Sequence, residues 1–111
     1  MANTFKNAKA VDVSNSSAAT IYTVPSATTS IILGLTLANK NAAARTVTVT
    51  WTDGSDSNAS TTLLNEVSIP GDTTLEVFAG QKYVLMTTDA MKILASAASS
   101  IDASLFYMEI T

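Results

Sequence analysis

Carboxylates are the only side chains in this sequence that offer conventional acid-base chemistry, because the chain has no His and no Cys. Without imidazole or thiol, catalytic triads, zinc sites and most proton shuttles are excluded. A glycosidase would need two carboxylates facing each other across a sugar cleft. Glu76 and Glu109 alternate with apolar neighbours and could share an outer strand face, where solvated charges also discourage edge pairing. We predict no catalytic residue and no enzymatic activity. The nine acids are Asp12, Asp53, Asp56, Glu66, Asp72, Glu76, Asp89, Asp102 and Glu109.

The segment 53–58, which reads DGSDSN, is the best candidate for a metal site, since Ca²⁺ selects closely spaced oxygen ligands. An EF-hand-like loop starting at Asp53 needs Gly at its sixth position and a bidentate Glu at its twelfth. Those positions hold Asn58 and Leu64. We therefore predict a polar hairpin loop, with no metal and no cofactor.

The charge pattern argues against nucleic acid and membrane partners. The formal charge is −3, only 14% of residues are charged, and the six cations are spread along the chain. Phosphate binding normally needs a clustered basic surface. The first 17 residues lack the apolar run of a signal peptide, and no segment has the roughly 20 apolar residues of a membrane span. We expect a protein made in a cytoplasm that binds neither nucleic acid nor membrane.

Alternation of apolar and polar residues predicts an all-β protein. In the segment 45–53, RTVTVTWTD, Val47, Val49 and Trp51 fall on one face and threonines on the other, as a strand with one buried side requires. We expect Trp51 to pack against the core rather than to form a sugar-stacking platform. Tyr22, Tyr83 and Tyr107 are expected to be half-buried, with hydroxyls that reach the surface.

About nine short strands bounded by turn residues predict one antiparallel β-sandwich over residues 16–111, of jelly-roll or immunoglobulin-like type. Residues 1–15 are expected to form a flexible N-terminal arm, except for a strand near its end. Pro70-Gly71 predicts a tight turn that makes Val67–Ile69 and Leu75–Val77 antiparallel neighbours. The segments 95–100 and 41–45 could instead be helical, for about one turn. The predicted strands are 10–13, 20–24, 29–38, 45–53, 61–69, 73–78, 83–87, 91–95 and 101–110.

Two of these strands are apolar on both faces, so something must cover the second face of each. In 31–37, Ile31, Leu33, Leu35 and Leu37 point one way, and Ile32, Gly34 and Thr36 the other. In 105–110, Leu105 and Tyr107 oppose Phe106, Met108 and Ile110. The cover is either a loop of the same chain or a protein partner, since contiguous apolar surface usually marks a contact site. The candidate interface residues are Ile32, Thr36, Phe106, Met108 and Ile110, and a dimer or trimer is expected.

Three sequence stretches stand out: IYTVP followed by SIILGLTLAN, then LLNEVSIPGDTTLEVFAGQKYVLM, and then the ending DAMKILASAASSIDASLFYMEIT. In this order they resemble small β-sandwich virion proteins of tailed bacteriophages, notably marine and cyanobacterial phages. Together they cover most of residues 20–111. Each motif is generic alone, and their order and spacing carry the resemblance.

The resemblance implies a non-enzymatic structural protein of the virion, assembled in the host cytoplasm. Its partners would be the major capsid protein or other virion proteins. A capsid decoration or cement protein that stabilises the head shell is the first expectation. A neck or tail protein at the head-tail junction is the alternative, and a carbohydrate-binding adhesive module is a third. The resemblance transfers no ligand residues to this chain.

Overall fold

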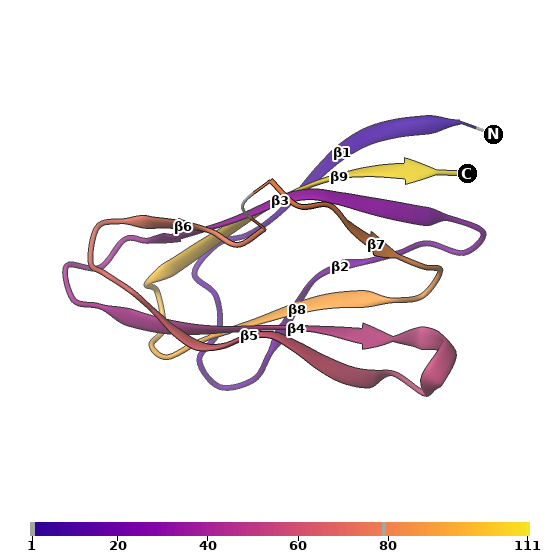
Figure 1. Cartoon of the computed structure of the whole chain (residues 1–111). Helices are drawn as coiled ribbons and strands as arrows, with labels where there is room; N and C mark the ends of the chain where they lie inside the picture. The colour runs from indigo at the N-terminus through magenta and orange to yellow at the C-terminus, as the bar shows by residue number, and fades with distance from the viewer. Residues whose placement is uncertain (1, 79) are drawn as a thin grey trace.

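The structure, a computed structural model, describes residues 2–78 and 80–111 as two antiparallel sheets packed face to face (Figure 1). A short 3-10 helix, η1 (Gly54–Asp56), lies in the loop between two strands. The strands are β1 (Asn3–Ala10), β2 (Ala19–Thr23), β3 (Thr29–Asn39), β4 (Arg45–Asp53), β5 (Ala59–Ile69), β6 (Thr74–Glu76), β7 (Tyr83–Leu85), β8 (Ala90–Ala95) and β9 (Ile101–Ile110). The predicted all-β sandwich is confirmed.

The strand order is that of a jelly roll. From the chain ends inward, β1 pairs with β9, β2 with β8, β3 with both β6 and β7, and β4 with β5. In this order, successive pairs lie in sheet A, sheet B, sheet A and sheet B. Sheet A has the order β1-β9-β3, with β6 and β7 along the far edge of β3, and sheet B has the order β2-β8-β4-β5. This nested antiparallel arrangement distinguishes the jelly roll from the immunoglobulin-like alternative.

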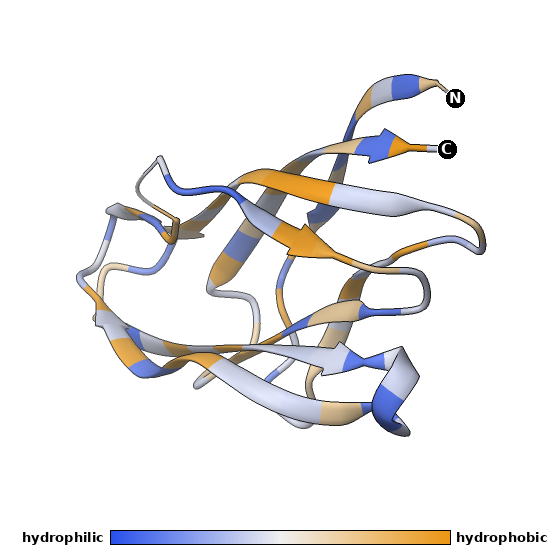
Figure 2. Cartoon of the chain, turned by 45° about the vertical axis from the view of Figure 1, so that its right-hand side comes forward, coloured by the Kyte–Doolittle hydropathy of each residue, from blue (hydrophilic) through white to orange (hydrophobic). Residues whose placement is uncertain are grey.

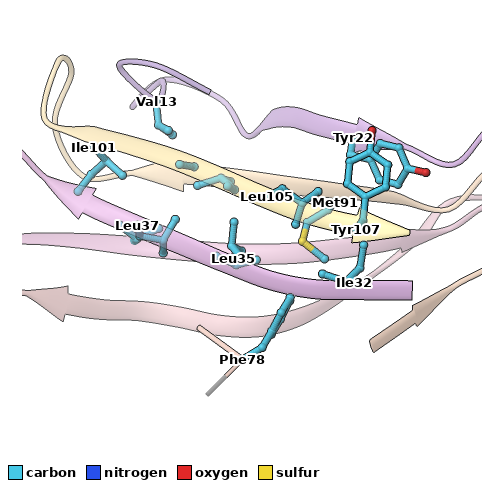
Figure 3. Close-up of a cluster of buried hydrophobic side chains, with 14 of the residues drawn as sticks. Val13, Tyr22, Ile32, Leu35, Leu37, Phe78, Met91, Ile101, Leu105 and Tyr107 are labelled. Atoms are coloured by element: carbon cyan, nitrogen blue, oxygen red, sulfur yellow. The ribbon is translucent and has the colours of Figure 1, made fainter. Parts of the chain in front are cut away.

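The core between the sheets consists of aliphatic side chains from both layers, with Tyr22 and Tyr107 together at one end (Figure 3). Val47 and Val49 of β4 are buried, as the alternation predicts. Trp51 is partly buried and packs against the same core. Figure 2 shows apolar residues distributed along the strands and polar residues around η1. Among residues 2–78 and 80–111, no helix has the length and apolar character needed to cross a membrane.

The turn at Pro70-Gly71 does not form a hairpin, and this prediction is wrong. β5 belongs to sheet B and β6 to sheet A, so the chain crosses between the layers at this point. The buried amide of Asn39 organises the crossing, since its Nδ2 donates to the carbonyls of Ala43 and Ile69, both at 3.0 Å. A Cβ on Gly71 would collide with the carbonyl oxygen of Ala42. Neither 41–45 nor 95–100 forms a helix.

The N-terminal segment forms a longer and earlier strand than the sequence predicts. The expected strand at 10–13 is replaced by β1, whose eight residues pair with β9 from Asn3↔Ile110 to Ala10↔Ala103. Most of the proposed arm is therefore an edge strand in this structure, while Met1 lies outside the described residues. Figure 1 shows β1 beside β9 at the margin of the sandwich, with both chain ends on the same side.

Candidate functional site

The outer face of sheet A carries a continuous row of apolar side chains across four strands. Phe5 of β1 lies opposite Met108 of β9, Met108 lies opposite Ile31 of β3, and Ile31 lies opposite Val84 of β7. Phe5 is 72% exposed and Val84 is 59% exposed, while Met108 and Ile31 are partly exposed. We call these four residues the apolar row. Directly opposed side chains on one sheet face are neighbours, so the row forms one surface.

A second apolar group lies beside the row. Phe106 is 45% exposed, and a shallow hollow between it, Phe5 and Leu33 opens on the same face. Gly34 lies opposite Phe106, and a Cβ there would be in ordinary contact with the Phe106 ring. Isolated exposed apolar residues are normal on protein surfaces, but a contiguous group usually marks an interaction site.

The five interface residues named from the sequence divide between two environments. Phe106, Met108 and Ile110 alternate with the buried residues of β9, and Thr36 is partly exposed on β3. Ile32 is fully buried, so its assignment to the outer face is wrong. The pairing of β3 with β9 shifts between Ile32 and Gly34, and a bulge of this kind reverses which side chains face inward. Whether the remaining four contact a partner stays a prediction.

Sequence analysis missed three of the four residues of the apolar row: Phe5, Ile31 and Val84. Ile31 was assigned to the core because the bulge was not foreseen. Phe5 was placed in the arm, although its alternation with polar neighbours in NTFKNAKA is compatible with a strand. Val84 is the central residue of a three-residue strand and gives too short a pattern to interpret.

Glu109 is a buried carboxylate, which contradicts its predicted place on an outer strand face. It is only 5% exposed and points between the sheets, where the Tyr22 hydroxyl donates to Oε2 at 2.7 Å. The Lys6 ammonium contacts Oε1 at 2.8 Å. Glu76 is exposed on β6, with β3 lying between it and β9, so the two carboxylates do not share a site.

The electrostatics of this cluster favour the ionised carboxylate. The hydrogen bond from Lys6, followed by that from Tyr22, lowers the pKa of Glu109 below its usual value. The same contact with Glu109 raises the pKa of Lys6. Burial raises the pKa of Tyr22 and of Tyr107, whose ring centroids lie 4.0 Å apart. The cluster therefore stabilises a fixed charge pair, because none of these pKa shifts moves a group toward neutral pH.

The loop at 53–58 uses its polar groups to build its own conformation. The Asp53 carboxylate caps η1 and accepts from the backbone N–H of Ser55 at 3.0 Å and from the Ser55 hydroxyl at 2.6 Å. Within residues 2–78 and 80–111, no group of three or more His, Cys, Asp or Glu residues is arranged to hold a metal ion. A polar hairpin loop is what the structure contains at this position.

Asp89 connects this loop to a neighbouring one. It is 3% exposed, and its two carboxylate oxygens accept from the backbone N–H groups of Gly54 at 3.0 Å and Met86 at 2.9 Å. Its own carbonyl accepts from the N–H of Val24 at 2.8 Å. Asp89 thereby holds together the loops that contain Gly54, Met86 and Val24 at one end of the sandwich, so we assign it a structural role.

The comparisons with known proteins show the fold. No protein-family model matches the chain, and no curated protein matches it in sequence. A chain of the cyanophage Pam1 capsid asymmetric unit aligns over 96% of this chain and 85% of its own length, with 18% identity and a TM-score of 0.54. A chain of the Bacillus endospore appendages, which are disulfide-linked pili, aligns over 100% and 91%, with 14% identity and a TM-score of 0.54.

A third match comes from the T13 viral particle of IBDV. It covers 96% of this chain with 12% identity and a TM-score of 0.55, but only 30% of the viral chain, so the likeness concerns one part of a larger protein. Identities this low establish a shared all-β fold and no more. The jelly roll of this chain is thus a fold that also occurs in components of viral particles and of pili.

Proposed function

We propose that this chain is a non-enzymatic structural protein of a bacteriophage virion, and that it binds the capsid as a decoration or cement protein. The observation that carries the proposal is the apolar row on sheet A, a contiguous exposed surface beginning with Phe5 and ending with Val84. A surface of this kind is costly to leave in water and is suited to a protein partner.

The shared fold with a chain of the Pam1 capsid and the resemblance to tailed-phage virion proteins support the capsid setting. The pilus match points to a different assembly, whose chains are linked by disulfides. This chain has no cysteine and cannot form such links. Non-covalent packing against virion proteins is therefore the better supported reading of the two.

The mechanism we infer is docking of a rigid body. Asp89 and Asn39 hold the loops at opposite ends of the jelly roll, so the sandwich presents the apolar row on a fixed frame. Packing this face against neighbouring capsid subunits would bury the apolar row, which the free protein exposes to water. Each buried square ångström contributes about 25 cal/mol, and repetition over the lattice would raise the temperature at which the shell opens.

The two alternative roles on the virion, a neck or tail protein and a carbohydrate-binding module, would use the protein differently. A neck or tail protein would use the same face against a different partner. A carbohydrate-binding module would need exposed aromatics among polar loop residues. Trp51 packs on the core and Tyr22 and Tyr107 are buried, while the exposed rings of Phe5 and Phe106 lie on strands, beside the apolar residues Met108 and Leu33. We therefore rank the adhesive role below the two structural roles.

The proposal is tested by removing the protein from the particle. Phage particles that lack it should release DNA more readily on heating or at low salt than complete particles do, and adding the purified protein should remove the difference. Equal release curves with and without the protein would refute the cement function. A loss of tails or of head-tail joining in the deficient particles would instead support the neck or tail role.

A further inference from the structure

β1 is an edge strand that contributes almost nothing to the hydrophobic core. Of the described residues, none of the fully buried core side chains comes from β1. Its positions on the inward face are small, polar or charged: Ala8 and Ala10 pack partly against the core, Lys6 reaches Glu109, and Thr4 lies opposite Glu109. The remaining residues of the strand are exposed. The core of the jelly roll would therefore be unchanged if the β1 strand of a second molecule of this protein replaced the chain's own β1.

A short hinge separates β1 from the first buried anchor of the domain. Val13 is buried, and its N–H donates to the carbonyl of Ile101 at 2.9 Å. Between Ala10 and Val13 lie only Val11 and Asp12. Asp12 has a φ of 54°, in the left-handed region, which Asp tolerates better than most L-residues but at a cost relative to Gly. An extended hinge would relieve that cost, release the contacts of Asp12 with Asp102 and Lys40, and direct β1 away from its own sheet.

The edge of β9 where β1 pairs favours a strand with particular side chains. Glu109 of β9 is buried and ionised, and among the described residues the cation that contacts its Oε1 comes from the strand beside β9, at the position of Lys6. The two inward positions further along must be small, as Ala8 and Ala10 are. A buried carboxylate without its partner is strongly unfavourable. The chain's own β1 meets both requirements in this structure, and the β1 of a second copy, having the same sequence, meets them equally.

We propose that β1 is exchanged between two copies of this chain, so that the β1 of each copy pairs with the β9 of the other. The exchanged strands make the same ladder and the same Lys6–Glu109 contact as the closed chain, and both hinges become extended. Exchange of an identical element is a low-cost route to a dimer. The second copy contributes the cation that completes the buried Glu109 cluster.

This inference is independent of the proposed virion role. It concerns the purified protein, whereas the virion role concerns where the protein binds on a particle. A dimer that fails to bind capsids, or a monomer that binds them, would separate the two proposals.

Cysteine crosslinking tests the exchange, because the natural chain contains no cysteine. Lys9 of β1 and Ser104 of β9 are directly opposed on the outer face. Opposed residues in an antiparallel pair have a Cα separation that a disulfide can span. We would mix the single variants Lys9→Cys and Ser104→Cys, incubate them at high protein concentration and then oxidise. Exchange predicts a disulfide-linked heterodimer as the main product.

A matched mixture of Lys9→Cys with Ser68→Cys measures random collisions, since Ser68 is exposed on β5 in the opposite sheet. Exchange predicts several times more heterodimer from the Ser104 mixture than from the Ser68 mixture. Equal yields, together with an intramolecular disulfide in the Lys9→Cys/Ser104→Cys double variant, would show that β1 stays on its own chain and would overturn the proposal.

Hinge variants give a second test that does not use cysteine. Asp12→Gly tolerates the left-handed φ, whereas Asp12→Val does not, and both lose the contact of Asp12 with Lys40. The comparison therefore isolates the hinge conformation. We expect the dimer fraction, measured by light scattering after size-exclusion chromatography, to be higher for Asp12→Val, with the dimerisation constant differing by about tenfold or more. Monomers of both variants at every concentration would contradict exchange.

Discussion

The substitution Phe5→Ala should weaken binding to the capsid without affecting the fold. Phe5 is 72% exposed at one end of the apolar row, and Met108 is its directly opposed neighbour. Its ring makes little contact within the domain, so the folded state loses little when the ring is removed. A partner that covers the row would, in contrast, lose a large apolar contact.

The magnitude follows from the exposed area. A phenylalanine buries about 200 Å² when fully covered, so a side chain that is 72% exposed offers about 140 Å² to a partner. At about 25 cal/mol per Å², covering it contributes about 3.5 kcal/mol. Alanine retains a small part of this area, which leaves a loss of about 2–3 kcal/mol. That loss corresponds to a Kd about 30- to 150-fold higher.

The assay is titration of purified protein onto particles that lack it, with the bound amount measured after sedimentation. Thr61→Ala is the control, because Thr61 is exposed on β5 in sheet B, away from the apolar row. Thermal unfolding of both variants checks the fold, and the Tm of each should match that of the natural protein. Binding by Phe5→Ala as tight as that of the control would refute the assignment of the apolar row as the docking face.

Three further predictions concern stability. Asp89→Ala leaves two backbone N–H groups without a charged acceptor and should lower the free energy of unfolding by about 3 kcal/mol in urea titrations; a loss under about 1 kcal/mol would contradict its structural role. Gly71→Ala places a Cβ against the Ala42 carbonyl and should cost about 1–3 kcal/mol by the same measurement, whereas an unchanged midpoint would show that the crossing can shift freely. The pKa of Glu109 is lowered on folding, so its contribution to stability is present above the pKa of the unfolded chain and is lost as pH falls through the folded value. Lys6→Met removes the main cause of that lower pKa and should flatten the fall of unfolding free energy as the pH drops below the pKa of Glu109 in the unfolded chain; an unchanged slope would argue against the ion pair.

The sequence predicted the strands whose side chains alternate strictly. β4 and β9 follow this rule over most of their length, because the two-residue period of a strand places every second side chain in the core. β3 does not. One extra residue near Gly34 inverts the pattern, so that Ile32 and Leu35 both face inward. No local composition marks the bulge in advance, since Gly34 is also compatible with a regular strand.

Features that depend on distant residues were the least predictable. Pro70-Gly71 has the residues of a tight turn, but the destination of the chain beyond it depends on Asn39, some thirty positions earlier. Glu109 resembles a surface charge within its own strand. It is buried because Lys6 and Tyr22, at the other end of the sequence, supply its partners.

The apolar face of sheet A was predictable in part from alternation within one strand and in part depends on residues distant in the sequence. Phe106 and Met108 could be named from alternation within β9 alone, and they do lie on the outer side of the strand. The row became visible only when β1 and β7 were placed on either side of β9 and β3, because it is a cross-strand feature. Sequence reasoning therefore identified part of the candidate surface and missed its two most exposed ends.

A cryo-EM reconstruction of the intact phage particle tests the central claim most directly. The account predicts density for this jelly roll repeated over the capsid lattice, with the outer face of sheet A, including Phe5 and Phe106, against the shell. Density confined to the portal or tail axis, or a lattice-bound protein that turns this face to solvent, would contradict it.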